Sequence, residues 1–130
     1  MKRCVIQLMS LLVLFSLTLP GCGTATTSFS LSLEEAFTNG LPTIAEFGSS
    51  TCIPCKQMKP ILEELAIEYK DRLNVVIVEV YEQRALTQQH NIITIPTQII
   101  FDSTGTEVTR HIGFWAKKDI VSQLIGLGIL

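Results

Sequence analysis

The sequence has little of what metal sites and nucleic-acid-binding surfaces need. It contains only two histidines, His90 and His111, which stand far apart, and four cysteines, of which only Cys52 and Cys55 are close neighbours. A structural zinc site usually takes four ligands, so this pair lacks partners nearby. Ten basic residues against twelve acidic ones give a net charge of −2, which does not favour contact with phosphate backbones. We therefore expect no metal, no cofactor and no nucleic-acid partner.

The sequence also lacks an apolar run long enough to cross a membrane as a helix. Its most apolar stretch, 5–19, is shorter than the roughly 20 residues that a spanning helix needs. Lys2 and Arg3 precede this stretch and supply the positive start of a secretory signal peptide. We therefore predict that residues 1–21 are a signal peptide, with an uncleaved anchor as the alternative.

The predicted signal peptide ends in a Leu-Pro-Gly-Cys motif at 19–22, which resembles a bacterial lipobox. In that motif the cysteine carries the lipid and becomes the new N-terminus, so the resemblance implies lipidation of Cys22. Cys4 would leave with the signal peptide, residues 22–28 would form a small polar tether, and 29–130 would form one domain. The domain would then lie outside the cytoplasm, on the periplasmic face in a diderm or the outer face of the cell membrane in a monoderm. An ordinary cleaved signal peptide is the alternative.

The two remaining cysteines lie where a predicted strand meets a predicted helix. Thr43–Phe47 is a short apolar segment, and Cys52–Asp71 shows the spacing of an amphipathic helix. The apolar positions of this helix are Met58, Ile61, Leu62, Leu65, Ile67 and Tyr69. The first turn of a helix has unpaired N–H groups and the positive end of the helix dipole. Both lower the pKa of a Cys52 thiol and make it a nucleophile near neutral pH.

Cys55 follows Cys52 by about one helical turn, so both lie on one face of the helix. Cys55 can therefore attack a mixed disulfide formed at Cys52 and close a Cys52–Cys55 disulfide, which is the minimum chemistry for thiol–disulfide exchange. Pro54 suits the first turn because a missing N–H costs little there, and Lys56 adds a cation beside the pair. Cys52 is the candidate nucleophile and Cys55 the candidate resolving cysteine.

These features, together with matches elsewhere in the chain, resemble the thioredoxin family over roughly 28–130. The matches are an acid six residues before the first cysteine, a proline five residues after the second, an Ile-Pro-Thr motif and two late glycines: Glu46, Pro60, Ile95, Pro96, Thr97, Gly105 and Gly113. The resemblance implies an α/β thioredoxin fold, with a central mixed β-sheet flanked by helices and a C-terminal β-hairpin and helix. It also implies activity as a thiol:disulfide oxidoreductase.

The resemblance implies roles for residues outside the cysteine pair. Glu46 stands where the family usually has a buried Asp. Burial would raise its pKa, so that it accepts the Cys55 proton directly or through a water. The Ile95–Pro96 bond would be cis, with Pro96 against the disulfide, where it keeps an approaching metal out, and with the backbone of Ile95 pairing with a substrate chain. The alternatives are an exposed acid on an edge strand and an ordinary loop proline.

Two residues of the cysteine motif depart from the family. Thr51 replaces the usual Trp before the first cysteine, and Ile53 replaces the usual Gly after it. Both changes alter the surface that meets protein partners. The residues expected to support the site are Ile53, Pro54, Lys56, Ile95 and Thr97.

The remaining segments supply the other predicted elements. Ser32 and Glu35 form a capping box that opens a short helix ending near Gly40, and Phe29 and Leu31 are expected in a short edge strand. Strands are predicted at Asn74–Val80, Thr97–Asp102 and Thr106–Ile112, and helices at Glu82–His90 and Trp115–Leu127. The last helix should bury Ile120, Val121, Leu124 and Ile125. The residues expected to be structural or solvated are His90, His111, Trp115, Lys59, Glu63, Glu64, Glu68 and Lys70.

We predict a thiol:disulfide oxidoreductase that is a monomer held to a membrane by the lipid on Cys22. It would reduce disulfide-containing protein substrates and be recharged by a membrane electron donor of the thiol-transfer type. The Cys-x-Pro-Cys-Lys motif and the Ile before the proline favour a reductant over an oxidant. One alternative is a thioredoxin-fold binding or metal-delivery module without redox turnover, holding a soft metal ion through two thiolates. Another is a dedicated reductant in cytochrome c maturation, although segment 81–94 has no room for the insertion typical of such proteins.

Overall fold

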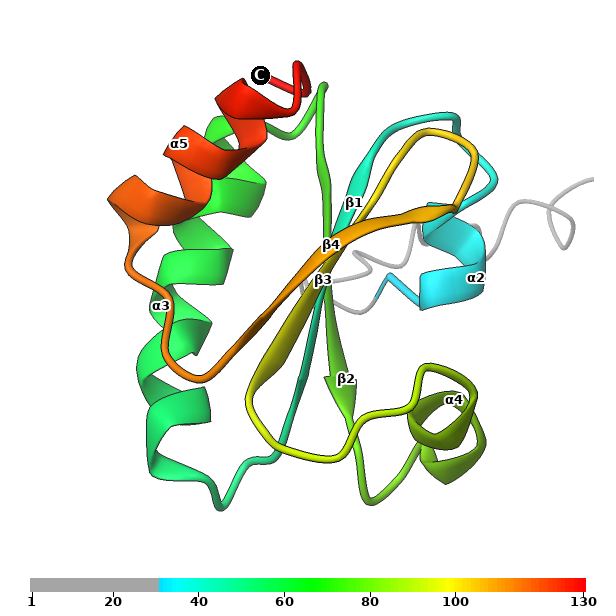
Figure 1. The fold of residues 1–130 in the computed structure, drawn as a ribbon, viewed down its shortest axis with the longest axis vertical. Helices are drawn as coiled ribbons and strands as arrows, with labels where there is room; N and C mark the ends of the chain where they lie inside the picture. The colour runs from blue at the N-terminus through cyan, green and yellow to red at the C-terminus, as the bar shows by residue number, and fades with distance from the viewer. Residues whose placement is uncertain (1–30) are drawn as a thin grey trace, which may run out of the picture.

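The structure is a computed structural model that describes residues 31–130 (Figure 1). Its elements along the chain are α2 (Leu33–Ala36), β1 (Thr43–Gly48), α3 (Ile53–Glu68), β2 (Asn74–Glu79), α4 (Arg84–Gln89), β3 (Thr97–Phe101), β4 (Glu107–Ile112) and α5 (Lys117–Gly126). The predicted signal peptide, Cys22, the tether and Phe29 lie outside the described residues. Within residues 31–130, no helix is both long and apolar enough to cross a membrane.

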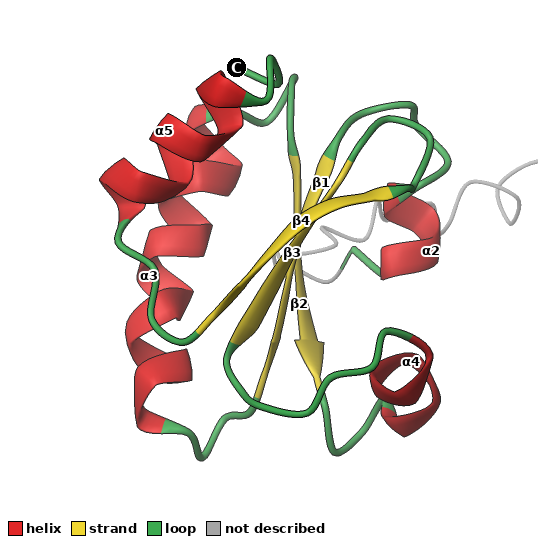
Figure 2. Ribbon diagram, viewed as in Figure 1, coloured by secondary structure: helices red, strands yellow, loops and turns green. Residues whose placement is uncertain are grey.

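One four-stranded sheet, in the order β2-β1-β3-β4, forms the centre of residues 31–130 (Figure 2). β1 pairs with β2 in parallel and with β3 in antiparallel, and β3 and β4 form an antiparallel hairpin. The predicted α/β fold with a mixed sheet and a C-terminal hairpin and helix is therefore confirmed. Every residue of β1 is buried, so neighbouring strands and helices hold the strand that leads to the cysteine pair.

Helices cover both faces of the sheet, α3 and α5 on one and α2 and α4 on the other (Figures 1 and 2). Alternate residues of β1 contribute to opposite faces, so Ile44 and Ala45 belong to different cores. On the α3/α5 face the core includes Ile44, Met58, Leu62, Leu65, Val75, Ile100, Trp115, Ile120 and Leu124. On the α2/α4 face it includes Leu33, Ala36, Ala45, Phe47, Val76, Val78, Ile99 and Phe101.

The short helix α2 begins with the predicted capping box. The Ser32 hydroxyl accepts a hydrogen bond from the Glu35 N–H at 3.2 Å, and the Glu35 carboxylate accepts one from the Ser32 N–H at 3.0 Å. At the start of β2, the Asn74 side chain donates to the carbonyl of Ala36 at 2.8 Å. This bond ties the end of α2 to the sheet. Leu31 is exposed and lies outside any strand of the described residues, so the predicted edge strand is wrong there.

Two apolar side chains that the helical pattern places inward are exposed. Ile67 of α3 is 76% exposed, because a step of two residues turns it about 200° away from the buried Leu65. Ile125 of α5 is 58% exposed, since it follows the buried Leu124 by about 100° and leaves the narrow buried stripe. The helix ends also differ by a few residues: α3 ends at Glu68, and α5 begins at Lys117, after the buried Trp115.

Candidate active site

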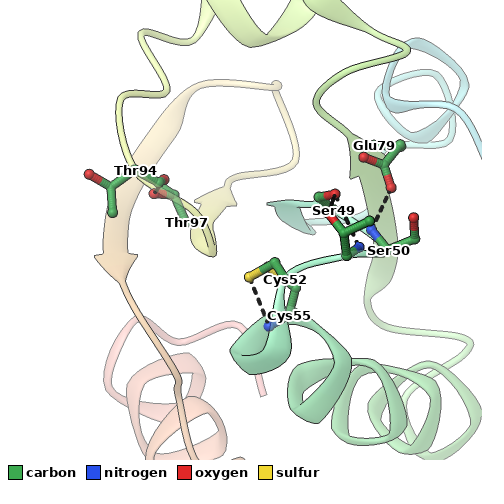
Figure 3. The surroundings of a disulfide bond; sticks show 8 residues. Ser49, Ser50, Cys52, Cys55, Glu79, Thr94 and Thr97 are labelled. Atoms are coloured by element: carbon green, nitrogen blue, oxygen red, sulfur yellow. Dashed lines mark hydrogen bonds between the residues drawn. A yellow bond between two sulfur atoms is a disulfide. The ribbon is translucent and has the colours of Figure 1, made fainter.

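The cysteine pair lies at the junction of β1 and α3, where the local sequence ends a strand and starts a helix. Cys52 is the N-cap residue of α3 and has an extended backbone, and a proline occupies the first turn. Cys52 and Cys55 form a disulfide, with their Cα atoms 5.2 Å apart. The N–H of Cys55 donates to the Cys52 sulfur at 3.3 Å (Figure 3). The pair therefore occupies the predicted position at the positive end of the helix.

The two cysteines differ in exposure. Cys55 is buried, with 6% of its surface exposed, whereas Cys52 is half-buried. Of the residues between them, Ile53 is 72% exposed and Pro54 is half-buried. An incoming reactant therefore meets Cys52 before Cys55.

The loop before Cys52 is held by the end of β2. The N–H of Ser50 donates to the Glu79 carboxylate at 2.8 Å, and the N–H of Val80 donates to the carbonyl of Gly48 at 3.0 Å. Figure 3 shows Glu79 reaching from its strand to this loop. The local sequence did not point to Glu79, because its role depends on the parallel pairing that sets it beside Gly48.

A second segment, at the start of β3, lies across from Cys52. The Ile95–Pro96 peptide bond is cis, and the Thr97 hydroxyl donates to the carbonyl of Thr94 at 2.6 Å. The N–H of Gly113 donates to the carbonyl of Pro96 at 2.8 Å, which ties this segment to the loop before α5. Figure 3 shows Thr94 and Thr97 on the segment that faces the Cys52 sulfur.

Glu46 lies in the middle of β1 and is only 3% exposed. The pKa of its carboxyl is raised to about 7. Burial is the larger cause, and the negative charge of Glu79 is the smaller one. Its Oε1 has no hydrogen-bond partner among residues 31–130. Gly48 leaves the space for this carboxyl, because a Cβ at Gly48 would lie 2.9 Å from the Glu46 Cδ. A carboxyl with a pKa of about 7 therefore lies inside the protein.

A cleft of about 510 Å³ connects Glu46 with Cys55. The charged residues that line it are Glu46, Lys56, Lys59, Glu63 and Glu79. Lys59 and Glu63 pair at 3.8 Å and are exposed, as expected of a solvated face, but this part of the face also borders the cleft. The cleft gives the buried carboxyl and the buried sulfur a common space that solvent can enter.

The two histidines lie apart from the cysteine pair. His90 caps the end of α4 and contacts the rings of Phe47 and Phe101, and His111 stacks on Trp115 with ring centroids 4.6 Å apart. Both have the structural surroundings that the sequence predicted. Within residues 31–130, no group of three or more Cys, His, Asp or Glu side chains is arranged to hold a metal ion.

Comparisons with known proteins agree with this geometry. The family model named Thioredoxin matches residues 24–125. A thioredoxin of Alicyclobacillus acidocaldarius subsp. acidocaldarius is 33% identical over 93 residues, covering 72% of this chain and 88% of the relative. A thioredoxin of Pyropia yezoensis is 31% identical over 91 residues (70% and 84%), and one of Staphylococcus aureus is 31% identical over 81 residues (62% and 77%).

A disulfide of two cysteines three residues apart, at the start of a helix that follows a central strand, defines a thiol–disulfide oxidoreductase. The chain belongs to the thioredoxin family. Proteins of this family act on disulfide-containing protein substrates, which agrees with the greater exposure of Cys52 than of Cys55.

Proposed function

We propose that this protein is a lipid-anchored reductant of disulfide-containing proteins outside the cytoplasm. The observation that carries the reaction is the unequal exposure of the two sulfurs. Cys52 is half-buried and faces outward, whereas Cys55 is buried and shares a cleft with Glu46. One sulfur can meet a substrate while the other completes the reaction from inside.

In the first step, the Cys52 thiolate attacks one sulfur of a substrate disulfide. A bond forms between the Cys52 sulfur and the substrate as the substrate S–S bond breaks, and the departing thiolate takes up a proton. The first turn of α3 stabilises the attacking thiolate, since its N–H groups, including that of Cys55, face the Cys52 sulfur. Lys56, in the same turn, adds a positive charge nearby.

In the second step, the Cys55 thiol gives its proton to the Glu46 carboxylate and attacks the Cys52 sulfur. The Cys52–Cys55 disulfide forms, and the second substrate sulfur leaves as a thiolate that is then protonated. Two electrons have then moved from the protein to the substrate. A carboxyl with a pKa of about 7 suits this step, because it can both take up and release a proton near neutral pH.

The substrate chain lies along the segment that ends in Pro96 and pairs with the backbone of Ile95. The exposed side chains near this segment are apolar. They include Ile53, Ile93 and Phe114, and Ile93 is 96% exposed. Phe114 directly follows Gly113, which bonds to Pro96. Exposed apolar side chains at these places support substrates whose disulfides are flanked by apolar residues.

The direction and place of the reaction rest on the sequence. The Cys-x-Pro-Cys-Lys motif and Ile95 resemble reducing members of the family, and the lipobox at 19–22 supports an anchor on Cys22, after removal of the signal peptide 1–21. The domain would act as a monomer on the tether 22–28. Outside the cytoplasm, a membrane electron donor of the thiol-transfer type would return two electrons to the disulfide.

The reduction potential of the Cys52–Cys55 couple tests the direction. The full chain, purified in detergent, is equilibrated against glutathione and dithiothreitol buffers, and the oxidised fraction is measured by mass spectrometry after thiol labelling. A value near that of thioredoxin, about −270 mV, supports a reductant. A value near −120 mV, as in a strong oxidant, would make the protein a disulfide donor instead.

Lipidation is tested separately. Cells that express the full chain are grown with a labelled fatty acid, and the label is followed on the protein and on a Cys22→Ser variant. We expect label and membrane association with Cys22 present and neither with the variant, while the reactivity of Cys52 stays unchanged. Label on both chains, or on neither, would contradict the anchor.

A further inference from the structure

The middle of β3 contains a polar side chain that the reaction above does not use. Gln98 is fully buried, at 0% exposure. Neither its amide nitrogen nor its amide oxygen has a hydrogen-bond partner among residues 31–130. Buried amides are nearly always paired, because an unmade hydrogen bond in the interior is costly. This side chain therefore needs an explanation.

The neighbour of Gln98 across the sheet is Glu46. The register pairs the two residues directly, and it pairs Gln98 with His111 on its other side. Residues opposite each other in an antiparallel pair have Cβ atoms about 4.5–5.5 Å apart and share a face. Glu46 Oε1 also lacks a partner among the described residues. Two adjacent side chains thus hold all the buried side-chain nitrogen and oxygen atoms without a partner among residues 31–130.

An amide complements a carboxyl in both of its protonation states. The amide NH₂ donates to a carboxylate, and the amide oxygen accepts from a protonated carboxyl once the amide has turned. The titratable groups that share the cleft with Glu46 or lie opposite Gln98 in the sheet are Glu79 from β2, Lys56, Lys59, Glu63 and Cys55 from α3, and His111 from β4. The lysines only donate and the ionised carboxylates only accept. Gln98, unlike them, lies directly opposite Glu46 in the sheet, and its amide can bond to the carboxylate as well as to the protonated carboxyl.

We propose that Gln98 is a positioning residue for the proton step at Glu46. Its amide bonds to the Glu46 carboxyl, directly or through one water, and turns when that carboxyl takes up the proton of Cys55. The inference rests on the proposed role of Glu46 in the second step. Gln98 carries no proton itself, but it keeps both forms of the carboxyl hydrogen-bonded.

The sign of the effect on Glu46 follows from this arrangement. The bond to the carboxylate is charge-assisted and stronger than the bond to the protonated carboxyl, so on balance the amide favours the charged form and lowers the pKa, which opposes the rise caused by burial. Removing the amide should therefore raise the pKa of Glu46. Less carboxylate would then be present at neutral pH to accept the Cys55 proton.

The test uses the reduced full chain in detergent with Cys4→Ser and Cys22→Ser, so that only Cys52 and Cys55 react with 5,5′-dithiobis(2-nitrobenzoate). Attack by Cys52 releases a first nitrothiobenzoate, and attack by Cys55 on the mixed disulfide releases a second. Both rates are measured from pH 5.5 to 9. In Gln98→Met, we expect the midpoint of the second release to rise by about one pH unit, which is about a tenfold slower release below the midpoint. The first release should not change.

The matched control is Ile100→Leu, which alters a buried side chain on the same strand and the same face. It should leave both pH profiles where they are. If Gln98→Met behaves like this control while Glu46→Gln changes the second release, the inference is overturned and the proposed role of Glu46 stands. If Glu46→Gln leaves the second release unchanged, both fail together.

A measurement on the unmodified protein covers the case in which Gln98→Met does not fold. Nuclear magnetic resonance can follow the side-chain amide of Gln98 and the carboxyl carbon of Glu46 as the pH changes. We expect the amide signals to shift with the same midpoint as the carboxyl. Amide signals that stay constant through the titration of Glu46 would overturn the inference.

Discussion

The two faces of the sheet are built from the same strands but serve different purposes. On the α2/α4 face, the inward residues of β1 are Ala45 and Phe47, and the core around them is apolar. On the α3/α5 face, the apolar core at Ile44 gives way to Glu46 two residues further along β1, towards the cysteine pair. The α3/α5 face thus gives up apolar packing at Glu46, where β1 approaches the cysteine pair. Variants on the two faces should accordingly separate stability from reactivity.

The largest effect is expected when each cysteine is replaced by serine, because this removes the sulfur that reacts. Cys52→Ser should reduce disulfide reduction to the background rate, because no attacking thiolate remains. Cys55→Ser should keep the first attack and accumulate a mixed disulfide with the substrate, which mass spectrometry detects under non-reducing conditions. A Cys52→Ser chain that traps substrate through Cys55 would reverse the two roles.

A substitution in the core of the α2/α4 face should lower stability and leave the reactivity of the cysteines unchanged. Phe47→Ala should lower the free energy of unfolding by about 3–5 kcal/mol, because it leaves a cavity in a fully buried core. The measurement is urea denaturation of the oxidised chain. After reduction of the disulfide, the folded fraction should react with 5,5′-dithiobis(2-nitrobenzoate) at the rate of the unmodified protein. A slowed reaction in that fraction would show that the two faces are not separable.

The pH dependence of stability should reveal the buried carboxyl of Glu46 on the α3/α5 face. The pKa of Glu46 is about 7 in the folded chain against an ordinary value of 4.5, so between these values the folded chain holds a proton that the unfolded chain has lost. Stability should therefore fall by about 3 kcal/mol as pH rises from about 4.5 to 7, and stay level above that. Urea denaturation across this range measures the slope.

The matched variants for that slope are Glu46→Leu and Glu63→Gln. The first removes the buried acid and should flatten the curve and raise stability at pH 8, since an apolar side chain then fills the site. The second removes an exposed acid of the same cleft and should leave the slope intact. Equal slopes in all three proteins would contradict a raised pKa at Glu46.

The smallest effect concerns the edge of the cleft. Glu79→Gln removes a negative charge near Glu46 but keeps an oxygen that can accept from the Ser50 N–H. We expect the pKa of Glu46 to fall by about half a unit, because like charges disfavour ionisation. The carboxyl carbon of Glu46, followed by nuclear magnetic resonance, reports this shift. A rise in that pKa would mean that Glu79 acts through the loop and not through its charge.

The sequence predicted the parts of the site that depend on neighbours along the chain. The position of the pair where a strand meets a helix, the proline in the first turn and the one-turn spacing to Cys55 are local features, although Cys52 itself is the extended N-cap and not a residue of the helix. The capping box at Ser32 was predictable for the same reason. The burial of Glu46 was predicted from the resemblance to the thioredoxin family, in which a buried acid stands at this position.

The parts that the sequence did not predict depend on pairing between distant strands. Glu79 reaches the loop before Cys52 only because β2 lies parallel to β1. Gln98 is a polar residue next to the apolar run of β3, and its burial follows from the helices that cover both faces of the sheet. Its pairing with Glu46 follows from the register of β1 and β3, which no local pattern specifies.

The short distance between Gly48 and the Glu46 carboxyl restricts how this sequence can change over evolution. The two positions share one volume, because a Cβ at Gly48 would collide with the Glu46 side chain. Gly48→Ala is therefore a harmful change while a glutamate stands two residues earlier. After Glu46→Asp, which withdraws the carboxyl by one methylene, the same alanine would find room. We therefore expect alanine at position 48 to go together with a shorter acid at position 46.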